Sequence, residues 1–484
     1  MRVEANIGQA VAKKAKPVIT RQAARHALTA NHLVNDGDRL VHEKVYRRIR
    51  HLILSGAVAH GDRLPSSRLL AENLRISRNS VLTAIDHLVA DGWLKSRRGS
   101  GVYVSYSGRR IAEASWSHGA ESPRGTIPFA LGWASDIFPV QVWNRLQSRR
   151  WRTSPEAILR QQDRNGVPAL REAIAAHVTL VRGLECLPSQ IFVTTCIPSA
   201  VELAVQALGL IGSEFWVEDP GCRSTLNALT RAEIRVVPIP VDERGMDIEN
   251  GISSAPDAAG VLVTPARQAP TGVMLDGARR NRLAQWARSA KAWIFEDDFN
   301  WNGDGSSPVI PPYAAQDRNR TIYFNSFNNI LFPGLRVAYL VAPTELTDTF
   351  AAVRGSEGDV NTANQLILAD FIEEGRLDTH MKRLNACNTE RRAALLDCVE
   401  RQLSKFLVPK HSAGGYFICG LDNFSEIDLL SAADAHNIAV TGMSEFELIA
   451  SGREEVVLGF SQFEPPGLAE AAAALRGVLN SLRP

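Results

Sequence analysis

Four polar residues open one apolar segment near the N-terminus, in the order Ser77, Arg78, Asn79 and Ser80. Apolar residues follow them at helical spacing, so the four stand in the first turn of an expected helix, where side chains point outward. An arginine at such a position can contact a guanine edge with two hydrogen bonds, and an asparagine can pair with adenine or bind a phosphate. The spacing therefore predicts a helix that reads bases in a major groove.

Further polar residues flank this segment on both sides. Arg68 lies near the start of the preceding expected helix, and Arg97 and Arg98 lie in a later turn that contains glycine. Guanidinium groups in these places suit phosphates, and glycines let the backbone approach closely. The expected nucleic-acid contacts are Ser66, Arg68, Ser77, Arg78, Asn79, Ser80, Arg97, Arg98, Gly99 and Ser100. The alternative is a small helical domain whose arginines only keep it soluble, and the ordered set of motifs disfavours it.

Three short helices must position these side chains. Gly56 and the pair Asp91-Gly92 are stop signals for the first and third helices, and Ser66 or Ser67 is the expected cap of the second. The apolar faces predicted for the three helices are Val45, Ile49, Leu52 and Ile53; Leu69, Leu70 and Leu74; and Val81, Ile85 and Leu88. Helices of this length joined by a tight turn are typical of a helix-turn-helix.

Two apolar runs after the third helix, W-L-K-S and G-V-Y-V-S, predict a β-hairpin, the wing. With L-P-S-S-R, S-R-N-S, D-G and R-R-G-S-G in this order, residues 41–104 resemble the winged helix-turn-helix of GntR-type bacterial transcription regulators. The resemblance implies that Arg68, residues 77–80 and the wing around Arg98-Gly99 touch operator double-stranded DNA, with the protein bound as a dimer.

Charge is unevenly distributed along the chain. Residues 1–110 hold 20 Lys and Arg against 8 Asp and Glu, a net charge of +12, whereas the remainder carries −10 and the whole chain +2. A basic quarter attached to an acidic body favours a polyanion-binding module fused to a second part. We expect residues 1–38 to be a flexible basic arm, 39–105 the DNA-binding domain, 106–127 a linker and 128–484 the body.

Composition excludes several classes of protein. With 484 residues, 45% hydrophobic and 22% charged, the chain is not wholly disordered and is long enough for two or more domains. No stretch approaches the roughly 20 apolar residues of a membrane span, and the N-terminus lacks the apolar part of a signal peptide. Six scattered cysteines without a C-x-x-C pair, and eleven histidines without a ligand cluster, disfavour a disulfide framework and a metal site. The expected location is the cytoplasm, without membrane partners.

Beyond the linker, short apolar strands alternate with helical segments, which predicts an α/β body with a mostly parallel sheet. The motifs V-T-P-A-R-Q-A-P-T-G, W-I-F-E-D-D-F-N and S-F-N-N-I-L-F-P-G-L-R follow in the order and spacing of MocR-type regulators. Those proteins join a GntR winged helix to a fold-type I aminotransferase domain that holds pyridoxal phosphate. The resemblance covers nearly all of residues 128–484 and implies this fold for the body.

The chain departs from the family pattern at the positions that would hold the cofactor. The resemblance places the lysine of the internal aldimine at Asn329, whose amide nitrogen is not a usable nucleophile. Phe299 stands where a tyrosine hydroxyl would contact the cofactor, and the phosphate cup, residues 195–199, reads T-C-I-P-S. Cys222 replaces an aromatic that would stack on the ring, and Val457 stands where a substrate-binding arginine often lies.

Other elements of the cofactor site are retained. By the resemblance, Asp297 matches the carboxylate that pairs with the pyridine nitrogen, and Ser326 and Arg336 match phosphate ligands. Two interpretations stay open: these residues, with Asn329, line a residual anion-binding pocket, or they are relics held by packing and ion pairs. We expect no covalently bound cofactor, with pyridoxal phosphate bound only noncovalently if at all.

Three functions compete. The first is a DNA-binding regulator whose enzymatically inactive large domain forms a homodimer and senses a small-molecule effector without Schiff-base chemistry. The second is a regulator that binds pyridoxal phosphate noncovalently as its effector, through Asp297, Ser326 and Arg336. The third is an active aminotransferase that carries a DNA-binding module, which requires a lysine within reach of the cofactor. The residue at position 329 favours the first.

Overall fold

The protein is described from a computed structural model, and its described residues fall into two compact units. The described residues are 41–54, 58, 60–97, 101–105, 127–160, 163–298, 310–354 and 360–482. The smaller unit holds those up to Ser105 and the larger unit those from Ile127 onward. The predicted basic arm and linker residues 106–126 lie outside the described residues, so both remain predictions.

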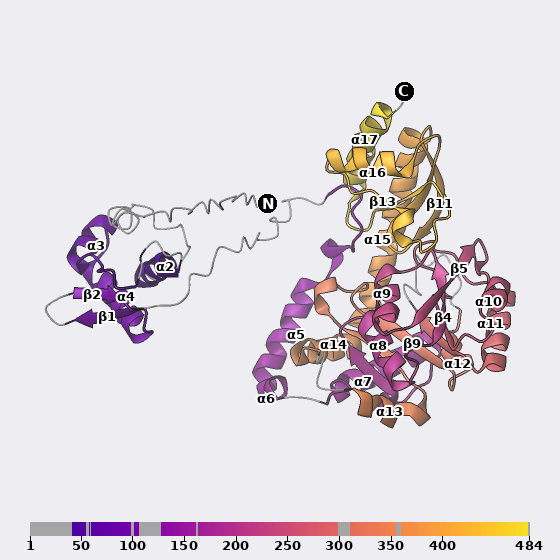
Figure 1. Ribbon diagram of the computed structural model, residues 1–484, viewed down its shortest axis with the longest axis horizontal. Helices are drawn as coiled ribbons and strands as arrows, with labels where there is room; N and C mark the ends of the chain where they lie inside the picture. Colours follow the sequence, from indigo (N-terminus) through magenta and orange to yellow (C-terminus); the bar gives the residue numbers. More distant parts are fainter. Residues whose placement is uncertain are drawn as a thin grey trace, which may run out of the picture. The chain divides into compact units, whose positions relative to one another are not determined.

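The described part of the small unit consists of three helices followed by an antiparallel hairpin (Figure 1). Its elements are α2 (Val41–Leu54), α3 (Ser67–Leu74), α4 (Arg78–Ala90), β1 (Leu94–Arg97) and β2 (Gly101–Val104). Leu94 pairs with Val104 and Arg97 with Gly101, which confirms the predicted wing. The predicted helix starts at residues 66–67 and after Ser77 are confirmed as well.

One predicted face in this unit was wrong. Leu70, Ala71 and Leu74 of α3 are buried, whereas Leu69 is 46% exposed. At about 100° per residue, Leu70 lies roughly 40° from Leu74 around the helix and Leu69 roughly 140° from it, so only Leu70 can share the buried face. The small side chain of Ala71 completes that face.

The described part of the large unit contains an eight-stranded sheet in the order β3-β10-β9-β8-β7-β4-β5-β6. The strands are β3 (Ile191–Thr194), β4 (Glu214–Asp219), β5 (Arg235–Asp242), β6 (Gly245–Met246), β7 (Gly260–Val263), β8 (Trp293–Asp297), β9 (Thr321–Ser326) and β10 (Ala338–Val341). The neighbours from β9 to β5 are parallel, and β10 runs antiparallel to both β3 and β9. The predicted mostly parallel sheet is confirmed.

Helices cover both faces of this sheet because its central strands are apolar along their whole length. Ile191 and Val193 pack with α7 on one face, whereas Phe192 between them packs with α8 on the other. The helices are α5 (Val140–Thr153), α6 (Pro155–Leu159), α7 (Pro168–Arg182), α8 (Ile197–Ala207), α9 (Arg223–Arg231), α10 (Ile248–Ser254), α11 (Gly277–Ala290), α12 (Tyr313–Gln316), α13 (Thr347–Val353), α14 (Thr362–Glu373) and α15 (Arg376–Cys398).

A second sheet lies toward the C-terminal end of the chain, with α15 between it and the first sheet (Figure 1). Its order is β11-β12-β14-β13, and its own core contains α17. The elements are β11 (Leu407–Ala413), β12 (Tyr416–Leu421), α16 (Glu426–Ala435), β13 (Thr441–Gly442), β14 (Glu455–Gly459) and α17 (Pro465–Ser481). Within the described ranges, no helix is both long and apolar enough to cross a membrane.

Candidate functional site

Serine hydroxyls fix the starts of the two helices that carry the predicted nucleic-acid contacts. The backbone N–H of Leu69 donates to Ser66 Oγ at 3.2 Å, and that of Ser80 donates to Ser77 Oγ at 3.0 Å. Ser77 Oγ also lies 2.9 Å from Ser80 Oγ. Each cap satisfies an N–H that the helix itself leaves unpaired. Ser66 and Ser77 therefore have a structural role besides any contact with a nucleic acid.

Arg78 and Asn79 lie exposed in the first turn of α4, as the sequence predicts. Arg78 Nε donates to Ser67 Oγ at 3.3 Å, which brings the guanidinium to the start of α3, where Arg68 is also exposed. Between the helices, Arg75 takes a left-handed conformation (φ 53°), and its N–H bonds back to α3. This turn places the side chains of Arg68, Arg78 and Asn79 at neighbouring helix ends.

The wing contributes one described arginine. Arg97 is exposed at the end of β1, and its guanidinium lies 4.9 Å from the centroid of the Tyr103 ring. Contact with an aromatic face restricts the conformations of the arginine side chain. Arg98, Gly99 and Ser100 lie outside the described residues, so their predicted contacts stay predictions.

In the large unit, the carboxyl ends of several strands meet at one edge of the sheet. Ala338 of β10 pairs with Thr194 on one side and with Ser326 on the other, so the ends of β3 and β9 flank it. Asp297 ends β8 and pairs with Phe324 of β9. The fold thus brings Asp297, Ser326 and the loop after Thr194 to the same edge, where open α/β sheets bind ligands.

Asn328, which sequence reasoning missed, holds the loop that follows β9. Its Nδ2 donates to the Thr195 carbonyl at 3.0 Å, and its Oδ1 accepts from the Val337 N–H at 2.8 Å. Its own N–H donates to Ser326 Oγ at 3.1 Å. In the sequence, Asn328 is the first asparagine of the pair N-N in S-F-N-N-I-L-F. The family pattern draws attention only to the second one, Asn329, so the first was overlooked.

Asn329 and Arg336 lie at exposed positions of this loop, and neither lines the pocket described next. Arg336 takes a left-handed backbone conformation with φ 57°. The neighbouring carbonyl of Ile330 accepts a hydrogen bond from His380 Nε2 at 2.9 Å, which anchors the loop to α15. The predicted group of Asp297, Ser326, Asn329 and Arg336 therefore shares an edge of the sheet, but only Asp297 reaches the pocket.

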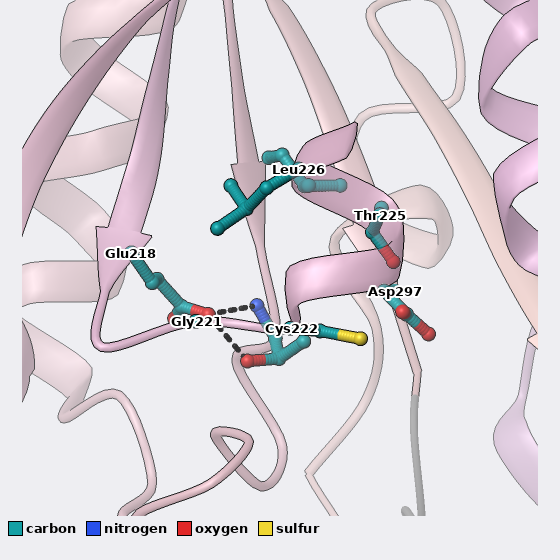
Figure 2. A pocket seen from close by; sticks show the side chains of 8 residues that line it. Glu218, Gly221, Cys222, Thr225, Leu226 and Asp297 are labelled. Carbon is teal, nitrogen blue, oxygen red and sulfur yellow. Dashed lines mark hydrogen bonds between the residues drawn. The ribbon is translucent and has the colours of Figure 1, made fainter. Parts of the chain in front are cut away.

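A small pocket, open to solvent, lies beside the ends of β4, β7 and β8. It is lined by Glu218, Gly221, Cys222, Thr225, Leu226, Leu262, Thr264 and Asp297. Figure 2 shows the Cys222 thiol, the Thr225 hydroxyl and the Asp297 carboxylate among the lining groups. A Cβ on Gly221 would lie 2.4 Å from the Glu218 carbonyl oxygen, so the turn after β4 requires glycine.

Glu218 is the second residue that sequence reasoning missed. Its carboxyl group is buried, and Oε2 accepts hydrogen bonds from the Thr264 N–H at 3.2 Å and from the Thr264 hydroxyl. Gln268 Nε2 donates to the same oxygen at 3.4 Å. Burial raises the pKa of Glu218 to about 7, and these hydrogen bonds offset only part of that rise. In the sequence, a carboxylate near the end of the apolar run F-W-V-E-D could have drawn attention to this residue.

Asp298, next to Asp297, is committed to the core. Arg182 of α7 donates to it from Nε at 2.7 Å and from Nη2 at 3.0 Å, and both side chains are almost fully buried. The Tyr323 hydroxyl also donates to Asp298, at 2.6 Å. This network ties α7 to the end of β8 and to the middle of β9, and so holds the strand that presents Asp297.

The residues present do not fit a covalently held pyridoxal phosphate. A carboxamide occupies position 329, and a carboxamide forms no Schiff base. In the cup, Ile197 and Pro198 begin α8, so proline removes one backbone N–H, and Cys196 makes no capping hydrogen bond. Cys222 lies exposed at the pocket where a stacking ring would stand. Phe299 lies outside the described residues.

Two further kinds of ligand-binding group were considered for this site: the arginine that often binds a substrate carboxylate, and a metal cluster. Val457 is fully buried in β14 and packs with Ile418 and Met443, so it belongs to a small apolar core. Among the described residues, no group of three or more His, Cys, Asp and Glu side chains is arranged to hold a metal ion.

Comparisons of the sequence match both units. Residues 41–104 match the family model described as bacterial regulatory proteins, gntR family, and residues 133–458 match aminotransferase class I and II. The chain is 31% identical to the probable rhizopine catabolism regulatory protein MocR of Rhizobium meliloti, over 93% of this chain and 96% of that protein. It is 28% identical to the pyridoxine biosynthesis transcriptional regulator PdxR of Corynebacterium glutamicum, over 86% of this chain and 91% of that protein.

Comparisons of the structure match the large unit. An archaeal alanine:glyoxylate aminotransferase superposes with a TM-score of 0.67 at 20% identity, covering 74% of this chain and 91% of that one. The α-aminoadipate aminotransferase LysN of Thermus thermophilus superposes with a TM-score of 0.67 at 23% identity, covering 74% of this chain and 93% of that one. At these identities the likeness shows a shared fold.

Proposed function

The chain belongs to the MocR-type transcriptional regulators, which join a gntR-family domain to an aminotransferase class I and II domain, and we propose that it binds operator DNA as a homodimer. In this proposal the large unit senses a small molecule without Schiff-base chemistry. The observation that carries the DNA-binding part is the exposed pair Arg78 and Asn79 in the capped first turn of α4. Such a turn suits base edges in the major groove.

Selection from a random double-stranded DNA pool tests this function. The purified full chain should enrich one sequence with two half-sites, and Asn79→Ala should weaken binding to it. Arg231→Ala is the matched control, because Arg231 is an exposed arginine of the large unit that pairs with Glu202. Enrichment of no sequence, or equal loss with the control, would refute operator recognition by α4.

A homodimer follows from the expected two half-sites, because symmetric DNA sites match a two-fold protein. Sedimentation analysis should give twice the chain mass of 52.9 kDa, in the presence and absence of DNA. A monomer that binds a single half-site would contradict this part of the proposal. As a DNA-binding regulator, the protein is assigned to the cytoplasm in the same proposal.

We also propose that the chain has no enzymatic activity, because Asn329 stands at the lysine position and because the phosphate cup, residues 195–199, differs from the family pattern. Incubation with pyridoxal phosphate followed by borohydride should leave no pyridoxyl group on any side chain that lines the pocket, as mass spectrometry of the peptides can show. Amino-acid turnover with an added keto acid should likewise be absent. A pyridoxyl adduct on a side chain that lines the pocket, or measurable turnover, would replace the proposal with an active aminotransferase.

Noncovalent binding of pyridoxal phosphate is the second candidate, favoured by Asp297 at the pocket and Ser326 at the same sheet edge. It predicts saturable binding of the cofactor that Arg336→Ala weakens. The names of the two relatives connect them with rhizopine catabolism and with pyridoxine biosynthesis, so family membership supports an effector without identifying it.

A further inference from the structure

The exposed side of α4 changes its chemistry between the first and the second turn. The first turn presents Arg78 and Asn79, two polar side chains that can form hydrogen bonds with base edges. The second turn presents Leu82 and Thr83, which are exposed as well. Leu82 is 37% exposed, whereas the preceding residue, Val81, is fully buried. The helix therefore carries an exposed apolar side chain next to the two groups that are proposed to contact bases.

Leu82 lies on the same side of α4 as the two polar residues. At about 100° per residue, it stands roughly 40° from Arg78 and roughly 60° from Asn79 around the helix, between the two. A recognition helix contacts base edges with its N-terminal residues, so a second-turn side chain in this sector faces the same groove. Asp86, roughly 40° from Leu82, belongs to the third turn and lies farther from that terminus.

The second turn has no side-chain donor left for a base edge. The Thr83 hydroxyl donates to the Asn79 carbonyl at 3.0 Å, a bond within the helix. The side chains of the other residues of this turn, Val81, Leu82 and Ala84, contain no hydrogen-bonding atom. Recognition by this turn therefore has to be apolar. In the major groove, thymine is the base that presents an apolar group, its C5-methyl.

Resting on the proposed function, we propose that Leu82 determines specificity by contacting the C5-methyl group of one thymine in each operator half-site. Four residues advance about 6 Å along a helix and base pairs stack about 3.4 Å apart, so this thymine lies within about three base pairs of the base that Arg78 contacts. Removing one methyl group from water corresponds to about a fourfold gain in affinity for each half-site.

Deoxyuridine tests the methyl contact, because it pairs with adenine as thymidine does and lacks only the C5-methyl group. Thymines of the selected operator are replaced at one position at a time, in both half-sites together, and binding isotherms of the full chain are measured. At one position the replacement should weaken binding about fourfold for each half-site. Equal affinity for all deoxyuridine operators would overturn the proposal, as would an operator without a thymine within about three base pairs of the position that Arg78→Ala relaxes.

Variants assign the methyl contact to one side chain. Leu82→Ala should bind both operators with the affinity that the wild-type protein has for the deoxyuridine operator, whereas Leu82→Met keeps an apolar side chain and should keep the difference. Leu180→Ala is the matched control, because Leu180 is an exposed leucine of the large unit. Thr83→Ser removes the other exposed methyl group of this turn and should also keep the difference.

A difference between the two operators that persists in Leu82→Ala, or that disappears in Thr83→Ser, would refute the assignment to Leu82. The same experiments separate this inference from the proposed function. A selection that enriches no sequence rejects operator recognition as a whole, whereas an enriched operator that the wild-type protein binds equally well with deoxyuridine rejects this inference alone.

Discussion

Helices α4 and α8 each begin at a site where the family pattern expects an anion, and their N-termini are built differently. At α4, Ser77 caps the helix through the Ser80 N–H, and Arg78 projects outward from the first turn. At α8, Cys196 makes no capping hydrogen bond and Pro198 lies in the first turn. The polar chemistry for binding an anion is kept at the first terminus and reduced at the second.

The difference concerns the residues that support each helix start. Around α8 the supporting contacts persist: Asn328 joins the loops after β3 and β9, and Arg182 with Asp298 fixes the end of β8. Structure in the large unit therefore depends on residues next to the positions that the family pattern assigns to the cofactor, whereas Arg78 and Asn79 of the small unit are exposed.

The largest expected effect comes from removing Arg182, which supports the end of β8 through its ion pair with Asp298. Arg182→Met should leave the Asp298 carboxylate buried without its partner and lower the free energy of unfolding by about 3–5 kcal/mol. Denaturant titration of the full chain, followed through the transition of the large unit, measures the change. Arg235→Met is the control, since its exposed pair with Glu214 contributes roughly 0–1 kcal/mol.

The paired substitution sharpens this test. In Arg182→Met with Asp298→Leu, both charges are absent, so much of the lost stability should return. Equal stability of Arg182→Met and the wild-type protein would show that the ion pair does not support the site, and the contrast between the two units would then need another basis.

The second test uses the pH dependence of stability. The pKa of Glu218 is about 7 in the folded protein against an ordinary value of 4.5, so the folded state binds more protons between these pH values. Stability that this group provides at pH 4.5 is therefore lost as pH rises through 7. Relative to the wild-type protein, Glu218→Gln should gain on the order of 3 kcal/mol across this window.

Unfolding free energies of both proteins at several pH values measure the gain. Glu249→Gln serves as control, because hydrogen bonding to Arg282 lowers the pKa of Glu249 and its contribution is lost only as pH falls below about 4.5. A constant difference between Glu218→Gln and wild type over pH 4.5–7 would mean that Glu218 is not held in a low-dielectric pocket.

Sequence reasoning predicted the helices, the wing and the parallel sheet because hydrophobic period and capping residues are local signals. It misplaced Leu69 because it grouped three leucines by residue type, whereas the helical angle of about 100° per residue puts Leu69 roughly 140° from Leu74 and leaves the buried face to Leu70 and Ala71. Glu218 and Asn328 were missed for a different reason. Their partners, Thr264 and Thr195, are distant in sequence, and only the sheet order brings them together.

The third test concerns Arg78 at the N-terminus of α4. Arg78→Ala should weaken binding to the selected operator by about 1–3 kcal/mol and relax the base preference at one position of each half-site. Binding isotherms with the operator and with single-base variants measure both effects. Equal weakening on every sequence would assign Arg78 to a phosphate, which moves base recognition to another residue.

The smallest effect compares the two helix starts directly. Ser77→Ala removes the acceptor of the Ser80 N–H and should lower the unfolding free energy of the small unit by about 1 kcal/mol. Ser77→Asp keeps an acceptor and should retain most of that stability. Cys196→Ala removes no cap, so it should cost the large unit less than Ser77→Ala costs the small one. Thermal unfolding together with hydrogen exchange at the first-turn amides separates the two units. A cost at Cys196 as large as that at Ser77 would show that α8 depends on its first residue as α4 does, and the distinction between a kept and a reduced anion site would fail at its simplest point.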